Sequence, residues 1–524
     1  MRDLNADERA IGRQNAHTAL GMTRRDVLRA AAAAPALGAF YYGYGPLGKD
    51  QPPVKAAIIG TGNEGCQAMI RDHNREYLEY VGFCDARPSQ QERAKKEFAS
   101  HKQYTAEDVK KITQYPDMKA MLADEQVEVV VIALPLWLHA PVAIEAMKMG
   151  KHVFCEKLMA HSVDECKQMV RLAHEKNRLL AIGHQRHYSA LYDNANYLVQ
   201  NGHLGEIRHI RALWHRNNAC PVMEKDEDGK PRYDGKGEPV YKHDANGNVV
   251  YFDGWKPDIP PEDRGIKYAD FGYKSLDELV RWRLYDRTGA GLMAELGSHQ
   301  LDACSIFLGK KHPRAVTGIG GTMFYKDGRE VDDHVFVTYD FPGQHKDDTV
   351  VVTYSSINTN AFEKYGETVM GTRGTMVVEE EKEILLYKEI DRNTWKGGTV
   401  RNTSITVETK AGVKPVIEAS PSASGPSAAS SLGGLAVGDP SRGYREELEH
   451  FAFCIRNGNQ SDYHGDTEHQ PRCRGEVALA DAVIALTSNL AMRQKRRIEF
   501  DERWFDYKST ETPEGSARAI ANRG

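Results

Sequence analysis

The sequence predicts two folded domains. Residues 51–185 should form a doubly wound α/β domain, and residues 186–505 a second domain that combines an open antiparallel β-sheet with helices on one face. Short apolar runs alternate with helical spacing up to about residue 185, as in a parallel sheet. Beyond about residue 204 the apolar residues recur with period two over longer stretches, which is typical of antiparallel strands. The length of 524 residues also exceeds what one hydrophobic core usually supports.

Residues 1–50 are predicted to be an export signal in a disordered N-terminus. Thr23-Arg24-Arg25-Asp26-Val27-Leu28-Arg29 precedes an alanine-rich stretch, 30–40, with Ala34-Pro35-Ala36 as the expected cleavage site. This arrangement resembles a twin-arginine signal, which implies passage through the twin-arginine export machinery to the periplasm or otherwise out of the cytoplasm. The other interpretation is an alanine-rich helix that begins with two arginines. Met22, directly before the motif, is a candidate for the true start, with residues 1–21 then an artefact.

Composition excludes several classes of protein. The net charge of −5 provides no basic surface for nucleic acid. No apolar run approaches the ~20 residues needed to cross a bilayer, so we expect no integral membrane span. The eight cysteines are scattered without a CxxC pair, so we expect buried free thiols rather than a disulfide framework or a metal site.

The strongest local pattern follows the apolar run 56–59. It comprises Gly60-Thr61-Gly62-Asn63-Glu64-Gly65 and, after a helix and a second apolar run, Asp85. Gly60 permits the tight turn, Gly62 lets the backbone approach a pyrophosphate, and Gly65 lets the helix pack on its strand. The helix N-terminus offers free N–H groups to the phosphates. The pattern predicts a Rossmann domain that binds a nicotinamide dinucleotide.

Asp85 bears on the choice of dinucleotide. It follows Gly65 at the distance where a carboxylate accepts hydrogen bonds from a ribose diol. Its charge would repel a 2′-phosphate, so NAD is the expected cofactor. Arg87, two residues further on, leaves NADP open.

The remaining elements are predicted from apolar periodicity, caps and turns. In the first domain the apolar runs predict strands at 128–134, 151–155 and 179–182, and helical spacing predicts helices at 138–149 and 162–176. Gly150 ends the first of these helices, and Ser162 and Glu165 form a capping box at the start of the second. The second domain should contain strands at 206–213, 315–325, 333–339 and 349–355, closed by helices at 444–457 and 475–496.

Three stretches are predicted to be additions to this plan. Residues 219–274 form a polar, turn-rich insertion with a hairpin signal at Asn246-Gly247. Residues 413–440 are rich in Pro, Ser, Ala and Gly and are interpreted as a flexible loop. Residues 506–524 form a C-terminal tail.

Three clusters carry groups suited to chemistry. Pro135-Leu136-Trp137-Leu138-His139 and Cys155-Glu156-Lys157-Leu158 each follow a strand at the carboxyl edge of the sheet, where ligands bind in such folds. Lys157 there could stabilise a developing alkoxide, although a lone lysine is more often a solvated surface residue. Glu295, His299 and Asp302 share one face at a helix start, which suits general acid–base work. Taken alone, this histidine is equally suited to a structural helix cap.

In their order along the chain these motifs resemble the Gfo/Idh/MocA oxidoreductases, over about residues 54–500. The resemblance implies a Rossmann domain followed by an open sheet domain that covers the nicotinamide and often forms the oligomer interface, so we expect a homo-oligomer. It implies that Lys157 and His299 are the catalytic pair. The residues that it places at the cofactor are Gly60 to Gly65, Asp85, Leu136 to His139, Glu156, and His184 or Gln185. Those that it places near the substrate or nicotinamide are Arg186, Trp282 and Arg283.

Two positions depart from the family pattern. Leu158 replaces a proline that follows the lysine through a cis bond, and a cis bond before a residue other than proline costs about 2.5–4 kcal/mol. We therefore expect Lys157 to be aimed differently. Glu295 replaces an aspartate and adds one methylene of reach toward His299 or a sugar hydroxyl.

The expected activity is hydride transfer between a tightly bound nicotinamide cofactor and a hydroxyl-bearing carbon of a sugar, polyol or glycoside. His299 would take the hydroxyl proton, oriented by Asp302 or Glu295. Two alternatives stay open. One is an NAD-dependent glycosidase that works by transient oxidation and elimination, against which the sequence Leu296-Gly297-Ser298-His299 counts. The other is a non-catalytic NAD- or sugar-binding regulator.

Overall fold

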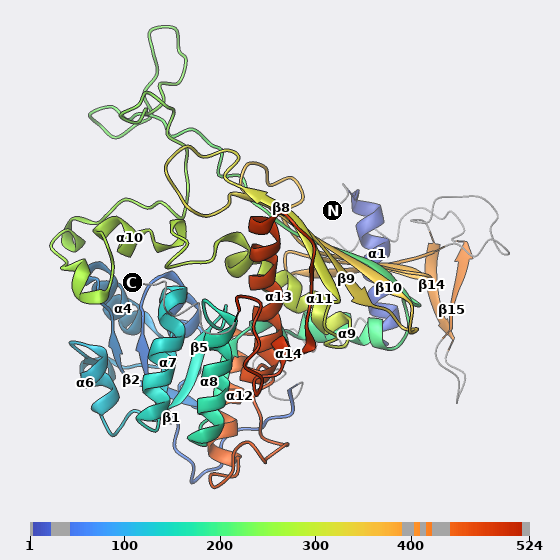
Figure 1. Cartoon of the computed structure of the whole chain (residues 1–524), viewed down its shortest axis with the longest axis horizontal. Coiled ribbons are helices and arrows are strands. Elements are labelled where there is room, and N and C mark those ends of the chain that lie inside the picture. Colours follow the sequence, from blue (N-terminus) through green and yellow to red (C-terminus); the bar gives the residue numbers. More distant parts are fainter. Residues whose placement is uncertain (1–3, 22–41, 390–402, 409–415, 422–440, 516–524) are drawn as a thin grey trace.

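The computed structural model describes residues 4–21, 42–389, 403–408, 416–421 and 441–515. The twin-arginine motif and most of 413–440 lie outside these residues. Two β-sheets form the body of the protein (Figure 1). One is the parallel sheet of the first domain, and the other is a larger, mostly antiparallel sheet, as the sequence predicts.

The first sheet has six parallel strands in the order β3-β2-β1-β4-β5-β6, which is the Rossmann order. Its strands are β1 (Val54–Ile59), β2 (Leu78–Cys84), β3 (Thr113–Gln114), β4 (Val129–Ile132), β5 (His152–Glu156) and β6 (Leu180–Gly183). The helices are η1 (Gly65–Ile70), α4 (Pro88–Ser100), α5 (Ala106–Lys111), α6 (Met118–Ala123), η2 (Leu136–Leu138), α7 (His139–Lys148) and α8 (Val163–Glu175). The predicted capping box of Ser162 and Glu165 is present at the start of α8.

The second sheet has eight strands in the order β13-β12-β11-β7-β10-β9-β8-β16. They are β7 (Ile207–His215), β8 (Ala315–Gly321), β9 (His334–Pro342), β10 (Thr349–Ile357), β11 (Tyr365–Gly371), β12 (Gly374–Glu379), β13 (Glu383–Lys388) and β16 (Ile498–Glu499). Neighbouring strands are antiparallel except β7 and β10. Strand β7 lies between β10 and β11, which run in opposite directions, so it is parallel to β10 and antiparallel to β11. Apart from this one pair the described sheet is antiparallel, as the sequence predicts.

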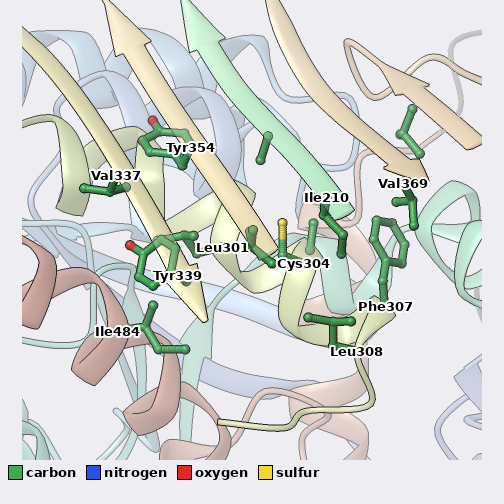
Figure 2. Packing of buried hydrophobic residues seen from close by; sticks show 14 of the residues in the cluster. Ile210, Leu301, Cys304, Phe307, Leu308, Val337, Tyr339, Tyr354, Val369 and Ile484 are labelled. Carbon is green, nitrogen blue, oxygen red and sulfur yellow. The ribbon is translucent and has the colours of Figure 1, made fainter. Parts of the chain in front are cut away.

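Helices cover one face of this sheet. They are α9 (Ala190–Gln200), η7 (Met293–Gly297), α11 (Ser298–Phe307) and α13 (Gly475–Gln494). Four shorter elements lie beside these helices or over the first domain: η3 (Gln185–Tyr188), α10 (Leu276–Val280), η6 (Trp282–Leu284) and α14 (Glu502–Phe505). Figure 2 shows the core between sheet and helices, where Leu301 of α11 lies beside Tyr339 of β9, and Phe307 of α11 beside Val369 of β11. The period-two burial of β9 and β10 leaves the residues of their other face exposed or half-buried. The predicted arrangement with helices on one face is confirmed.

Two C-terminal helices, α12 (Tyr444–Asn457) and α13, complete the fold, and their bounds lie near the predicted ones. By length and composition α13 is apolar enough to cross a membrane, which the sequence prediction missed, but most of it is buried inside the protein. It is therefore a core helix. All eight cysteines are free thiols, as predicted; seven are buried and Cys220 is exposed.

Residues 6–19 correct the prediction of a disordered N-terminus. They form α1 (Ala6–Ala19), which packs on β13, the edge strand of the second sheet. Arg9 forms ion pairs with Glu379 and Glu383, and the buried Asn15 donates to the carbonyl of Leu386 at 3.0 Å. These contacts weigh against the interpretation of residues 1–21 as an artefact. The sequence gives little sign of them because most of the partners of α1 lie about 370 residues away.

The other additions differ in part from prediction. Within 413–440, residues 416–421 form β15 (Val416–Pro421), which pairs with β14 (Thr403–Glu408) instead of forming a loop. Val416 and Ile417 favour extended backbone, which explains the difference. The C-terminal segment packs on the first domain: Lys167 on α8 donates to the main-chain carbonyls of Arg503, Ser509 and Glu511, and Glu514 accepts a hydrogen bond from the Val163 N–H at 2.7 Å.

Replacing Gly12 with Leu should undock α1. A Cβ at Gly12 would lie 2.6 Å from the Tyr387 hydroxyl oxygen and 2.9 Å from Leu385 Cβ. Overpacking of this kind costs ~1–3 kcal/mol, although leucine favours a helix more than glycine does. Amide hydrogen exchange over residues 6–19 should rise in Gly12→Leu and stay unchanged in Gln14→Leu, on the exposed side of the same helix. Equal protection in both variants would contradict this docking.

Candidate cofactor and active site

The glycine loop has the geometry that a dinucleotide requires. Gly60 has φ +91°, and a Cβ there would lie 2.3 Å from the Ala133 carbonyl oxygen. A Cβ at Gly65 would lie 2.1 Å from the Gly60 carbonyl oxygen, so only glycine lets the helix approach. At Gly62 no described atom lies within 4 Å of that position, which leaves the space that a pyrophosphate needs. The residues present therefore fit the dinucleotide.

Asp85 stands at the end of β2, held by the glycine loop. Its carboxylate accepts hydrogen bonds from the Thr61 N–H at 2.7 Å, the Thr61 hydroxyl at 3.1 Å and the Arg87 N–H at 2.8 Å. Burial raises the pKa of Asp85, and these hydrogen bonds oppose that rise. The carboxylate is thus fixed at the place where an adenosine ribose lies in this fold.

One cleft of about 1830 Å³ joins this loop to the second domain. Of the predicted site residues, fifteen line it: Gly60, Gly62, Asn63, Glu64, Asp85, Arg87, Pro135, Leu136, His139, Glu156, Lys157, Trp282, Arg283, Glu295 and His299. The glycine loop and His299 therefore face the same space, as the sequence interpretation required. The individual roles of these residues stay predictions.

Lys157 lies at the carboxyl end of β5, and its ammonium donates to the Glu295 carbonyl oxygen at 2.9 Å. The Lys157–Leu158 bond is cis, so the replacement of proline by Leu158 has not removed that conformation. His139 ties this loop to the preceding strand, because its two ring nitrogens contact the carbonyl oxygens of Leu158 and Leu134, both at 2.8 Å. Through the Glu295 carbonyl, the second domain therefore contacts Lys157 directly.

His299 lies in the first turn of α11, directly after the π-helical turn η7. Its ring is 5.6 Å from the Trp214 ring, and its Nδ1 has no hydrogen-bond partner among the described residues. Burial, followed by the positive charges of Lys157 and Arg186, holds the pKa of His299 well below its usual value. The imidazole is therefore neutral near pH 7 and able to accept a proton.

The two carboxylates beside His299 correct the prediction that one of them orients it. Glu295 instead pairs with Arg283 at 2.7 Å; burial raises its pKa, but Arg283 and Lys157 outweigh burial and leave the pKa lowered. Asp302 pairs with His187 at 2.8 Å and Lys310 at 2.7 Å. The reason is rotation along the helix: Asp302, one turn after His299, faces the buried interior rather than the cleft.

Five other predicted residues and two glycine-loop positions do not line the cleft: Asp302, Trp137, His184, Gln185, Arg186, Thr61 and Gly65. Arg186 corrects the prediction of a substrate contact, since its guanidinium is buried against Glu367 at 3.0 Å and Glu381 at 2.9 Å. His184 and Gln185 are buried behind the cleft wall, and burial lowers the pKa of His184 to about 3. Trp137 packs edge-to-face on Tyr273 instead.

Several cleft residues were missed by sequence reasoning. Trp214 lies near the end of β7 and Arg216 directly follows that strand, Trp255 and Tyr273 come from the insertion, Arg442 precedes α12, and Tyr444 is its first residue. The sequence held one signal for this region, a glycine at 443 directly before the predicted helix 444–457. In the structure Gly443 has φ +99°, and a Cβ there would lie 2.2 Å from the Gln185 carbonyl oxygen. The remaining residues come from segments far apart in the sequence, which only the fold brings together.

Two parts of the chain match known protein families. Residues 54–184 match the oxidoreductase family with an NAD-binding Rossmann fold, and residues 267–377 match the GFO/IDH/MocA C-terminal domain. These two parts of the chain are therefore similar to the two domains of the GFO/IDH/MocA oxidoreductases, and the Rossmann fold that residues 54–184 match binds NAD.

The similar proteins are distant. An oxidoreductase of Schizosaccharomyces pombe is 23% identical over 329 residues, 62% of this chain and 71% of that protein. The inositol 2-dehydrogenase of Salmonella typhimurium is 31% identical over 171 residues, 32% of this chain and 48% of the enzyme. Among solved structures, an inositol dehydrogenase homologue of Azotobacter vinelandii with NADH and myo-inositol has a TM-score of 0.56 at 14% identity, covering 86% of this chain and 98% of its own. That likeness confirms the fold.

Two glycine substitutions should separate packing from cofactor binding. Gly65→Ala should destabilise the protein by ~1–3 kcal/mol, since the methyl group meets a main-chain oxygen. Gly62→Ala should leave the unfolding temperature unchanged but weaken NAD at least about tenfold, because the methyl group enters the space for the pyrophosphate. Thermal unfolding and calorimetric NAD titration measure both effects. NAD affinity equal to wild type in Gly62→Ala would contradict the assigned phosphate site.

Proposed function

We propose that the protein is an NAD-dependent oxidoreductase acting on a hydroxyl-bearing carbon of a sugar, polyol or glycoside. The observation that carries the proposal is the shared cleft, in which the glycine loop, Lys157 and a neutral imidazole of His299 face one space. Bound NAD supplies a nicotinamide ring that accepts or returns a hydride. The protein must then manage the proton of the hydroxyl group and the charge on its oxygen.

His299 and Lys157 divide that work. His299 accepts the hydroxyl proton, for which its lowered pKa keeps it unprotonated. The Lys157 ammonium has three N–H groups, one of which is engaged by the Glu295 carbonyl. Another can donate to the oxygen as it becomes an alkoxide. Glu295 acts through its contacts with Lys157 and Arg283 rather than on the imidazole.

The walls of the cleft support a carbohydrate substrate. Rings of Trp214, Trp255 and Trp282 line it together with the charged groups of Arg216 and Arg283. Aromatic faces with a few polar groups suit a ring that is apolar on its C–H faces and carries hydroxyls at its edge. The similarity to the inositol 2-dehydrogenase of Salmonella typhimurium and to the Azotobacter vinelandii structure with myo-inositol supports a substrate of this class, a sugar or polyol.

The proposal extends to location and assembly. Export by the twin-arginine route would carry the folded protein with NAD already bound, and NAD would then be regenerated in the same site. Homo-oligomerisation through the open sheet face is supported by its exposed apolar side chains: Ile319 is 69% exposed and Phe336 is 44% exposed.

Replacing His299 with Ala should abolish turnover while NAD stays bound. Turnover is followed with myo-inositol and aldoses as substrates, and bound nucleotide by absorbance and mass spectrometry of the purified protein. His345→Ala, a substitution at an exposed histidine outside the cleft, should keep wild-type rates. Undiminished turnover in His299→Ala would remove the imidazole from the mechanism. Release of free sugar from an aryl glycoside without net reduction of NAD would favour the glycosidase instead.

The pH profile of sugar oxidation should report the lowered pKa of His299. Because burial and Lys157 favour the neutral ring, the base is already competent below the usual histidine pKa of ~6.5. We expect kcat to stay level as the pH falls through 6.5 and to decline only at more acidic pH. A decline centred near pH 6.5 would show that the imidazole is not held neutral by its surroundings.

A further inference from the structure

The second half of the insertion reaches back over the first domain. Residues 253–273, called the strap from here on, contain the turns η4 (Pro261–Asp263) and η5 (Tyr268–Phe271). The strap lies beside the start of α4 (Figure 1). Its residues Gly254, Trp255, Asp270, Phe271 and Tyr273 line the cleft. The strap is therefore a wall of the cofactor site contributed by the second domain.

Asp263 fastens the strap to the first domain. Its side chain is fully buried, and its carboxylate accepts hydrogen bonds from Arg87 Nε at 2.9 Å, the Ser89 N–H at 2.9 Å and the Ser89 hydroxyl at 2.6 Å. Arg87 occupies the N-cap position of α4 but makes no capping hydrogen bond with its side chain. Asp263 thus caps α4 from 174 residues away along the chain.

This contact decides what Arg87 can do. An arginine just after the acid at the end of β2 is the group that accommodates a 2′-phosphate in NADP-binding Rossmann domains. Here its guanidinium is paired with the buried Asp263, while Asp85 stands two residues before it. A 2′-phosphate would meet two carboxylates and a guanidinium whose charge is already matched. We propose that Asp263 is a specificity-determining residue that makes this site select NAD over NADP.

The rest of the strap keeps Asp263 in place. Trp137 Nε1 donates to the Tyr273 hydroxyl at 3.3 Å, and their rings pack edge-to-face at 5.3 Å. Gly272 has φ +79°, and a Cβ there would lie 2.9 Å from the Trp137 ring. Arg287 donates to the Gly272 carbonyl at 3.1 Å and lies over the Trp137 ring at 4.6 Å. The C-terminal end of η5 is therefore anchored, while Asp263 itself fastens the strap at η4.

The test is the ratio of NADP to NAD dissociation constants, measured by calorimetric titration of the nucleotide-free full chain. Asp263→Asn removes the charge that holds Arg87 while keeping the shape of the side chain. The freed guanidinium should pair with the 2′-phosphate, so the ratio should fall by at least about tenfold. Asp258→Asn makes the same charge change on an exposed residue of the strap and should keep the wild-type ratio. An unchanged ratio in a folded Asp263→Asn protein overturns the proposal.

A second variant tests the same idea without altering Asp263. Because Arg87 is already engaged, Arg87→Gln in the otherwise wild-type chain should leave the ratio within about twofold. A selective loss of NADP binding in Arg87→Gln would show that the guanidinium was available to the 2′-phosphate, which contradicts the proposal. In the double variant Arg87→Gln/Asp263→Asn the gain in NADP affinity should vanish. These measurements need no substrate, so their outcome is independent of the proposed reaction.

Discussion

The position of the two domains relative to each other depends on α13, a helix that is apolar around most of its circumference. Leu479, Val483 and Leu486 belong to the core beside α8, whereas Ile484 and Met492 belong to the core under the second sheet. A helix buried on opposite sides cannot tilt without opening cavities, and deletion of one buried leucine side chain alone costs about 2–5 kcal/mol. Since η7 and α11 pack on α13, this constraint fixes His299 at the carboxyl edge of the first sheet.

Burial at this junction then sets the chemistry of the cleft. The same low-polarity surroundings that lower the pKa of His299 raise the pKa of Glu156, because burial disfavours whichever form is charged. Asp302 keeps its charge by pairing with Lys310 and His187. The positive charge of Lys157 is accommodated by a main-chain carbonyl rather than a carboxylate, which leaves an ammonium facing the cleft.

Two segments outside the two-domain plan, α1 and the strap, add contacts at the edge of the second sheet and at the cleft. Helix α1 covers the edge strand β13, where unpaired main-chain groups would otherwise be exposed, and the strap closes the cleft beside α4. Both act through buried or half-buried polar contacts over long sequence separations. Such contacts leave almost no trace in local sequence, because the partners share neither a helix turn nor a strand pair.

The sequence by itself determined the sheet types, the approximate bounds of the elements it predicted and the cofactor loop, since glycine requirements, capping boxes and apolar periods are local properties. It also singled out Lys157 and His299, both of which line the cleft: Lys157 directly follows β5, and His299 lies in the first turn of α11. Only the tertiary structure decided which neighbours these residues meet: Asp302 turns to Lys310, Arg186 to Glu367, and Asp263 to Arg87. Side-chain partners depend on helix rotation and on packing between distant segments, and neither is encoded in spacing along the chain.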